Sequence, residues 1–90
     1  MNPSEESLAE VKREHLIREA MRWENALKAN AYGILMDWAM AEDAFQETLI
    51  LLNQKWAEYE DGKAVLPWAR QIIKFKALNM RRKAQRQITV

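Results

Sequence analysis

Cysteine is absent from this chain of 90 residues, which also has only two glycines and two prolines. Without cysteine there can be no disulfide, no thiolate zinc site and no thiol chemistry, and this fits a protein of the reducing cytosol. Because glycine and proline are strong turn formers, their scarcity predicts few turns. Alanine, leucine, glutamate, lysine, arginine and glutamine are abundant, and these residues favour helix. We therefore predict an all-α fold.

Long hydrophobic runs are also missing, since none approaches the ~20 apolar residues that a membrane span needs. The N-terminus is acidic rather than a basic lead into an apolar segment, so we expect a soluble, cytoplasmic protein. Ninety residues can close one hydrophobic core, which predicts a single domain, a bundle of three to four helices. His15 is the only histidine, and neither a nucleophilic triad nor a Glu-x-x-His pair is present. We expect no enzymatic activity, catalytic residue, metal site or cofactor.

Charge is divided unevenly along the chain. Residues 1–61 carry all 13 acidic residues and only six lysines and arginines, a net charge of −7, whereas residues 62–90 carry eight basic residues and no acid. This asymmetry suggests two kinds of partner, one of them an anion such as nucleic acid. The alternative is that the basic end packs against the acidic end of the same chain.

Apolar residues at spacings of three and four predict a long helical region in the first part of the chain. Asn2 as a cap and Pro3 at the first helical position mark its start, and residues 1–9 lead into the domain. One unbroken helix here would be about 50 Å long, so we expect a bend or break near Asn25, Asn30 or Gly33. The apolar stripe that we assign to the core is Leu16, Ala20, Trp23, Leu27, Ala31, Ile34 and Trp38.

Asp37 can cap a second helix, which we expect to run to about Glu58. One face of this helix is apolar and is assigned to the core; it consists of Ala41, Ala44, Phe45, Thr48, Leu49, Leu52 and Trp56. The opposite face carries Ile50 among the polar residues Asp43, Gln46, Glu47 and Gln54. A large aliphatic residue surrounded by acids and amides is not expected on a helix face that contacts only water. The pattern therefore indicates a surface kept for a partner.

Asp61-Gly62 is the clearest turn signal in the chain, and we expect a third main helix to begin between Ala64 and Trp68. Its apolar side would hold Val65, Trp68, Ala69, Ile72 and Phe75. Its polar side is purely basic, with Arg70, Lys74 and Arg81 within about 40° of one another. Such a face can neutralise phosphates without reading sequence. The helix should end near Arg86, and residues 87–90 are expected to begin a linker.

The loop before this helix offers aromatic and polar groups, namely Tyr59, Asp61, Lys63 and Trp68. An aromatic ring that stacks on an unpaired base contributes roughly 1 to 3 kcal/mol, which can offset the cost of extruding that base from a duplex. Tyr59 is equally compatible with this role and with a place in the core. Trp68 shares a face with Ile72 and Phe75, which favours the core.

Several of these motifs, in order, resemble region 2 of bacterial RNA polymerase sigma factors, in particular the extracytoplasmic-function group. They are Ala41-Glu42-Asp43-Ala44-Phe45-Gln46-Glu47-Thr48, the Asp-Gly turn, Trp68, Ile72-Ile73, Ala77 and Arg81-Arg82-Lys83. The resemblance covers about residues 10–86. The chain departs from the family where it has Ala64-Val65 in place of Pro-Phe, Ile73-Lys74-Phe75 in place of Ala-Arg-Asn, and Asn79 in place of Asp.

The resemblance implies a role in transcription initiation with two macromolecular partners. One is core RNA polymerase, whose β′ clamp helices would be bound by Asp43, Gln46, Glu47 and Ile50. The other is the minus-ten promoter element, with a flipped base of the non-template strand; the implied DNA-binding residues are Tyr59, Asp61, Lys63, Arg70, Lys74, Arg81 and Arg82. An anti-sigma factor is a further partner that the resemblance allows. The alternatives are a dimerising helical module and a general nucleic-acid-binding helical domain.

Overall fold

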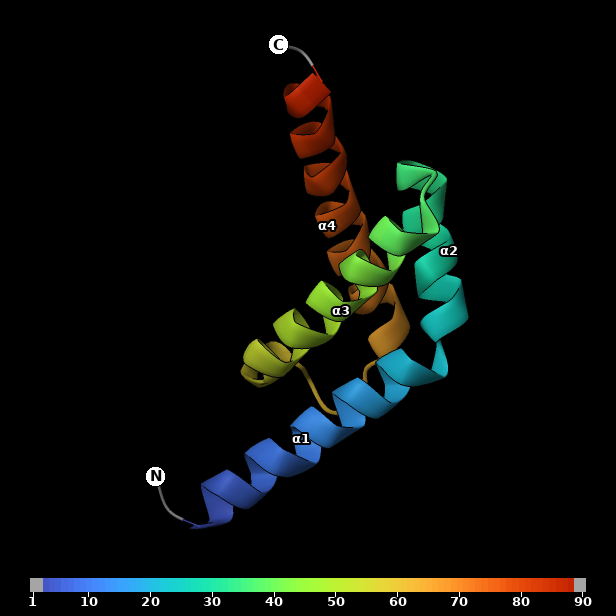
Figure 1. Cartoon of the computed structure of the whole chain (residues 1–90). Helices are drawn as coiled ribbons and strands as arrows, with labels where there is room; N and C mark the ends of the chain where they lie inside the picture. The colour runs from blue at the N-terminus through green and yellow to red at the C-terminus, as the bar shows by residue number, and fades with distance from the viewer. Residues whose placement is uncertain (1–2, 89–90) are drawn as a thin grey trace.

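The computed structural model describes residues 3–88, and nearly all of them are helical (Figure 1). The elements in chain order are α1 (Pro3–Arg22), α2 (Glu24–Leu35), α3 (Trp38–Gln54), the short 3-10 helix η1 (Trp56–Glu58) and α4 (Val65–Ile88). No strand occurs within this range. The predicted all-α bundle is therefore confirmed.

The N-terminal helical region breaks at Trp23, two residues before the nearest predicted position. The Trp23 N–H is shared between the carbonyl oxygens of Glu19, at 3.3 Å, and Ala20, at 3.2 Å, so the α-helical pattern tightens there and α2 leaves in a new direction (Figure 1). Gly33 lies inside α2 and breaks nothing. The predicted cap, Asn2, lies outside the described residues.

The break changes which residues of the predicted apolar stripe reach the core. Leu16, Leu27 and the stripe's alanines are buried, but Trp23 is 40% exposed and Trp38 is 58% exposed. The spacing of the stripe assumes one continuous helix. In the structure, Trp23 lies at the break between α1 and α2. Trp38 begins a new helix after Met36, whose backbone is left-handed. The two tryptophans were therefore wrongly assigned to the core.

Helix α3 starts as predicted, because the Asp37 carboxylate accepts a hydrogen bond from the Met40 N–H at 3.0 Å. It ends at Gln54 rather than near Glu58, since the chain tightens into η1. The predicted Asp-Gly turn is present, with Gly62 at a positive φ of 85°. The continuing helix α4 includes residues 87 and 88, which were assigned to a linker, while residues 89–90 lie outside the described range.

The main core lies between α2, α3 and α4, where Leu27, Phe45, Leu52 and Ile73 are fully buried. A smaller cluster joins α1 to the segment between α3 and α4, and consists of Leu16, Tyr59 and Val65 with the partly buried Trp56 and Trp68. Phe75 was assigned to the core but is 58% exposed, because α4 turns Ile73 and Ala77 inward instead.

The molecule is elongated, with extents of 53 × 25 × 18 Å. The first turns of α1 and the last turns of α4 project at opposite ends (Figure 1). Within residues 3–88, no helix is long and apolar enough to cross a membrane.

Candidate functional site

The polar face of α3 is exposed, as its sequence pattern predicted. Asp43, Gln46 and Glu47 are all exposed, and Ile50 has 57% of its surface accessible. None of the three polar side chains forms a hydrogen bond or ion pair with any residue in the described range. The opposite side of α3 holds the buried Ala41, Ala44, Phe45, Thr48 and Leu52. The face is thus presented by a rigid, well-packed helix with its polar groups free.

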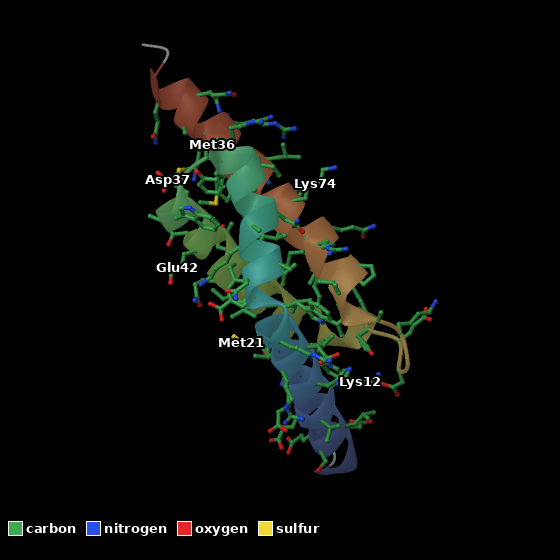
Figure 2. All side chains as sticks on the ribbon, turned by 90° about the vertical axis from the view of Figure 1, so that its right-hand side faces the viewer. Lys12, Met21, Met36, Asp37, Glu42 and Lys74 are labelled. Carbon is green, nitrogen blue, oxygen red and sulfur yellow. The ribbon has the colours of Figure 1, made fainter. Side chains whose placement is uncertain are left out.

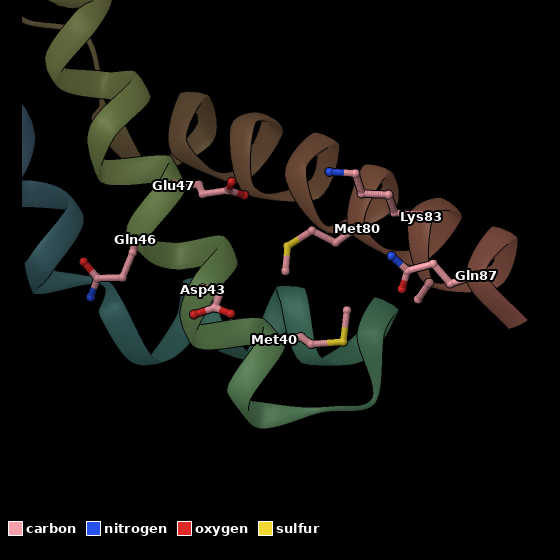
Figure 3. Close-up of a pocket in the computed structure, with 8 residues that line it drawn as sticks. Met40, Asp43, Gln46, Glu47, Met80, Lys83 and Gln87 are labelled. Carbon is pink, nitrogen blue, oxygen red and sulfur yellow. The ribbon is translucent and has the colours of Figure 1, made fainter.

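This face continues into a groove between α3 and α4, of about 470 Å³. Met40 on α3 and Met80 on α4 project into the space between the two helices (Figure 3). Asp43 and Glu47 line the α3 side, and Lys83 lines the α4 side. The sequence pattern did not reveal the contribution of α4, because it depends on how α4 crosses α3. Methionine side chains adapt readily to an apolar group that enters such a groove.

The basic face of α4 is equally free. Arg70, Lys74, Arg81 and Arg82 are exposed, and none of them forms an ion pair with a described acid. Arg82 makes one weak hydrogen bond, to Asn79 at 3.4 Å. The other α4 cations without an ion pair in this range are Lys76, Lys83 and Arg86.

Asp43 and Glu47 share the groove with Lys83, but Arg70, Lys74 and Arg81 of the basic face are not paired with any acid of the described range. Figure 2 shows Lys74 on the opposite side of α2 from Asp37 and Glu42. The acids that do form ion pairs bind cations of α1 and α2, Lys55 after the end of α3, or Lys63 of the loop; one example is Glu42 with Lys28 at 3.8 Å. Within residues 3–88 no cation of α4 is paired with an acid, so the ion pairs do not support the alternative in which the basic end is neutralised by the acidic end. A row of uncompensated cations on one helix attracts a polyanion.

The loop between η1 and α4 holds the remaining predicted DNA-binding residues. Tyr59 is only 7% exposed; its hydroxyl donates a hydrogen bond to the Lys63 carbonyl at 2.5 Å, and its ring stacks on His15. Tyr59 is therefore a core residue in this structure, and its burial does not support a role in stacking on a base. Asp61 and Lys63 project into solvent.

Beside this loop lies a pocket of about 380 Å³, to which the first turns of α4 also contribute. Its walls include Tyr59, Lys63, Pro67, Trp68 and Gln71. The sequence pattern named three of these residues, but not Pro67 or Gln71, because only the folded loop places them around one space. The pocket offers an aromatic wall, an amide, the carboxylates of Glu58 and Glu60, and the Lys63 cation, which lies 3.8 Å from the Glu60 carboxylate. Within residues 3–88, no group of histidine, aspartate and glutamate side chains could hold a metal ion.

The described helices form a domain with one face of unpaired cations, on α4, and one face of unpaired polar side chains, on α3, joined by a turn. The model of the sigma-70 region 2 family matches residues 20–87, and the chain belongs to this family. Its role is therefore that of a sigma factor domain in transcription initiation, with core RNA polymerase and promoter DNA as partners. Neither the curated proteins nor the solved structures gave a match to this chain.

Proposed function

We propose that the exposed face of α3 binds the β′ clamp helices of core RNA polymerase through Asp43, Gln46, Glu47 and Ile50. The observation that supports this assignment is the freedom of the three polar side chains, which keep all their hydrogen-bonding capacity for a partner. Ile50, exposed among them, supplies apolar area at the centre of the surface. This proposal also includes the extracytoplasmic-function group, because the helix that carries the Ala41–Thr48 string is followed by a short loop and then by a helix that opens near Trp68 and carries Arg81 and Arg82.

The double variant Gln46→Ala/Glu47→Ala tests the polymerase contact. Its affinity for core polymerase should fall by about 30-fold, since interface side chains of this kind contribute on the order of 1 kcal/mol each. The matched control is Ser7→Ala/Glu10→Ala, which removes one neutral polar group and one carboxylate from exposed positions on α1. An equal affinity for both double variants would refute the docking assignment, and so would a stable dimer in gel filtration that buries Ile50.

The same proposal assigns α4 and the preceding loop to the minus-ten promoter element. Arg70, Lys74, Arg81 and Arg82 would bind phosphates along α4, which is about 36 Å long. The pocket beside the loop would take one flipped base of the non-template strand, with Trp68 and Pro67 as its apolar walls and Lys63 at its edge. Melting of the duplex would then be favoured because the unpaired base gains these contacts.

Binding to a forked promoter DNA, whose non-template strand is unpaired at the minus-ten element, tests the base-capture step. The complex with core polymerase should bind this DNA more tightly than the same sequence as full duplex. A general nucleic-acid-binding domain would instead bind strands of any sequence alike. Equal affinity for the cognate and a scrambled unpaired strand would therefore refute the assignment of the loop.

A further inference from the structure

Helix α1 lies largely outside the residues that the family model matches, yet it makes most of the side-chain contacts to the loop. The match begins at residue 20, whereas α1 begins at Pro3. Residues 12, 13, 15 and 16 of α1 each meet a residue in or beside the loop. These contacts form one continuous zone where α1 passes beneath the segment between α3 and α4.

The central contact of this zone is between His15 and Tyr59. Their rings stack with centroids 5.5 Å apart and planes 10° apart, and the His15 Nε2 lies 3.3 Å from the Tyr59 hydroxyl. That hydroxyl has a single proton, which it donates to the Lys63 carbonyl. The His15 Nε2 must therefore carry the hydrogen and donate it to the Tyr59 oxygen. A chain of two hydrogen bonds thus links α1, through Tyr59, to the far side of the turn.

Contacts on either side of His15 extend the same arrangement. The Lys12 ammonium lies 3.9 Å from the carboxylate of Asp61, at the tip of the turn. The Arg13 guanidinium lies 5.3 Å from the centre of the Trp56 ring, at the start of the segment. Leu16, fully buried, packs with Tyr59 in the smaller core cluster. Helix α1 therefore contacts the beginning, the middle and the tip of the segment.

Apart from α1, the turn is held by a few contacts of its own and by the packing of Tyr59 against Val65 and Trp68 of α4. The backbone closes it with one hydrogen bond, from the Lys63 N–H to the Glu60 carbonyl at 3.2 Å. Gly62, at a positive φ, has no side chain to pack. Tyr59 also forms a wall of the pocket beside the loop. His15 and Leu16 of α1 hold that wall from one side, and Val65 and Trp68 of α4 also pack against it.

We propose that α1 orders the loop for base capture, with His15 as the positioning residue that acts through Tyr59. This inference rests on the proposed function, in which the loop pocket takes a flipped base. A loop that is already ordered loses less conformational entropy when the base enters, so affinity for the unpaired strand is higher. His15 itself need not touch the DNA.

The test replaces His15, because this exposed side chain can be changed without opening a cavity in the core. His15→Leu keeps an apolar contact but removes the donor to Tyr59. His15→Gln restores an N–H donor at the end of the side chain. Ser7→Ala, exposed on the same helix, is the control. Each full chain is assembled with core polymerase and titrated with forked promoter DNA, and hydrogen exchange is followed at the Tyr59 and Lys63 amides.

His15→Leu should weaken binding of the forked DNA by about threefold to tenfold, the value of one hydrogen bond. It should also speed exchange at both amides, while affinity for core polymerase stays unchanged. His15→Gln should return both measurements toward the wild type, which a general loss of stability would not allow. DNA affinity within twofold of the wild type for His15→Leu would overturn the inference, as would a failure of His15→Gln to restore it.

Base capture by the loop and ordering of the loop by α1 are tested by different measurements. If the wild-type complex does not distinguish forked from duplex DNA, the base-capture function is wrong. The exchange rates then decide whether α1 orders the loop at all: faster exchange in His15→Leu supports that part, and unchanged exchange refutes it. If the wild type prefers forked DNA but His15→Leu binds it equally well, only the role of α1 is wrong.

Discussion

Neutralising Lys74 and Arg81 should weaken the salt dependence of promoter binding by a calculable amount. The two side chains project from the same face of α4, about 10 Å apart along the helix axis, and both are exposed. Neither is paired with an acid in the described range, so neither must give up an internal contact in order to bind a phosphate. The double variant Lys74→Gln/Arg81→Gln removes both charges and keeps two side chains that favour helix.

The expected magnitude follows from counterion release. Each phosphate contact to duplex DNA contributes about 0.9 to the slope of log K against log salt, so the loss of two contacts should lower the slope by about 1.8. When salt rises from about 50 to about 200 mM, the wild type should therefore lose about 12-fold more affinity than the variant. On a single-stranded site the slope should fall by only about 1.4.

Fluorescence anisotropy of labelled promoter DNA, titrated with the preassembled polymerase complex at several salt concentrations, measures the slope. The matched control is Arg22→Gln/Lys55→Gln, which lowers the net charge equally but removes cations that are paired with Glu19 and Glu58 and lie away from α4. The control slope should equal that of the wild type. An equal fall in both variants would mean that only net charge matters, and an unchanged slope in the α4 variant would exclude this face from the DNA.

Three further outcomes test the fold. Ile73→Ala should lower the free energy of unfolding by about 2 to 5 kcal/mol because its side chain is fully buried, whereas the exposed Ile50→Ala should change it by less than about 0.5 kcal/mol; urea titration compares them. Asp37→Ala should cost about 1 kcal/mol through loss of the α3 cap, and Asp37→Asn should cost less. The hydrogen bond from Lys28 to Glu24 raises the pKa of Lys28 above 10.5, so this stabilisation is present below pH 10.5 and is lost as pH rises through the raised pKa. Lys28→Gln should therefore show a shallower fall in Tm above pH 10.5, and a fall as steep as in the wild type would contradict this.

Local patterns were sufficient to predict most of the secondary structure. The cap at Asp37, the turn at Gly62 and the start of α4 near Pro67 each depend on a residue and its immediate neighbours. The exposed face of α3 was predicted for the same reason, since helical periodicity alone separates polar Gln46 from buried Phe45. Only the exact ends of helices were misplaced, because a tightened turn such as η1 leaves no distinct sequence signal.

The candidate site was predicted in part. The cations of α4 were identified from the absence of acids after Asp61, but the sequence could not show that they remain unpaired, since this depends on where α1 places its glutamates. Tyr59 was equally compatible with core and surface. Its burial follows from the contact with His15, 44 residues away in sequence, which no local pattern encodes.

By itself, the sequence determined the all-α class, the separation of charge and the free face of α3, because each follows from composition or from the 3.6-residue helical period. The tertiary structure decided everything that depends on how helices cross: the exposure of Trp23, Trp38 and Phe75, the groove between Met40 and Met80, and the support of the loop by α1. The physical reason is that each of these features depends on contacts between residues far apart in the sequence, such as His15 and Tyr59, which the helical period does not encode.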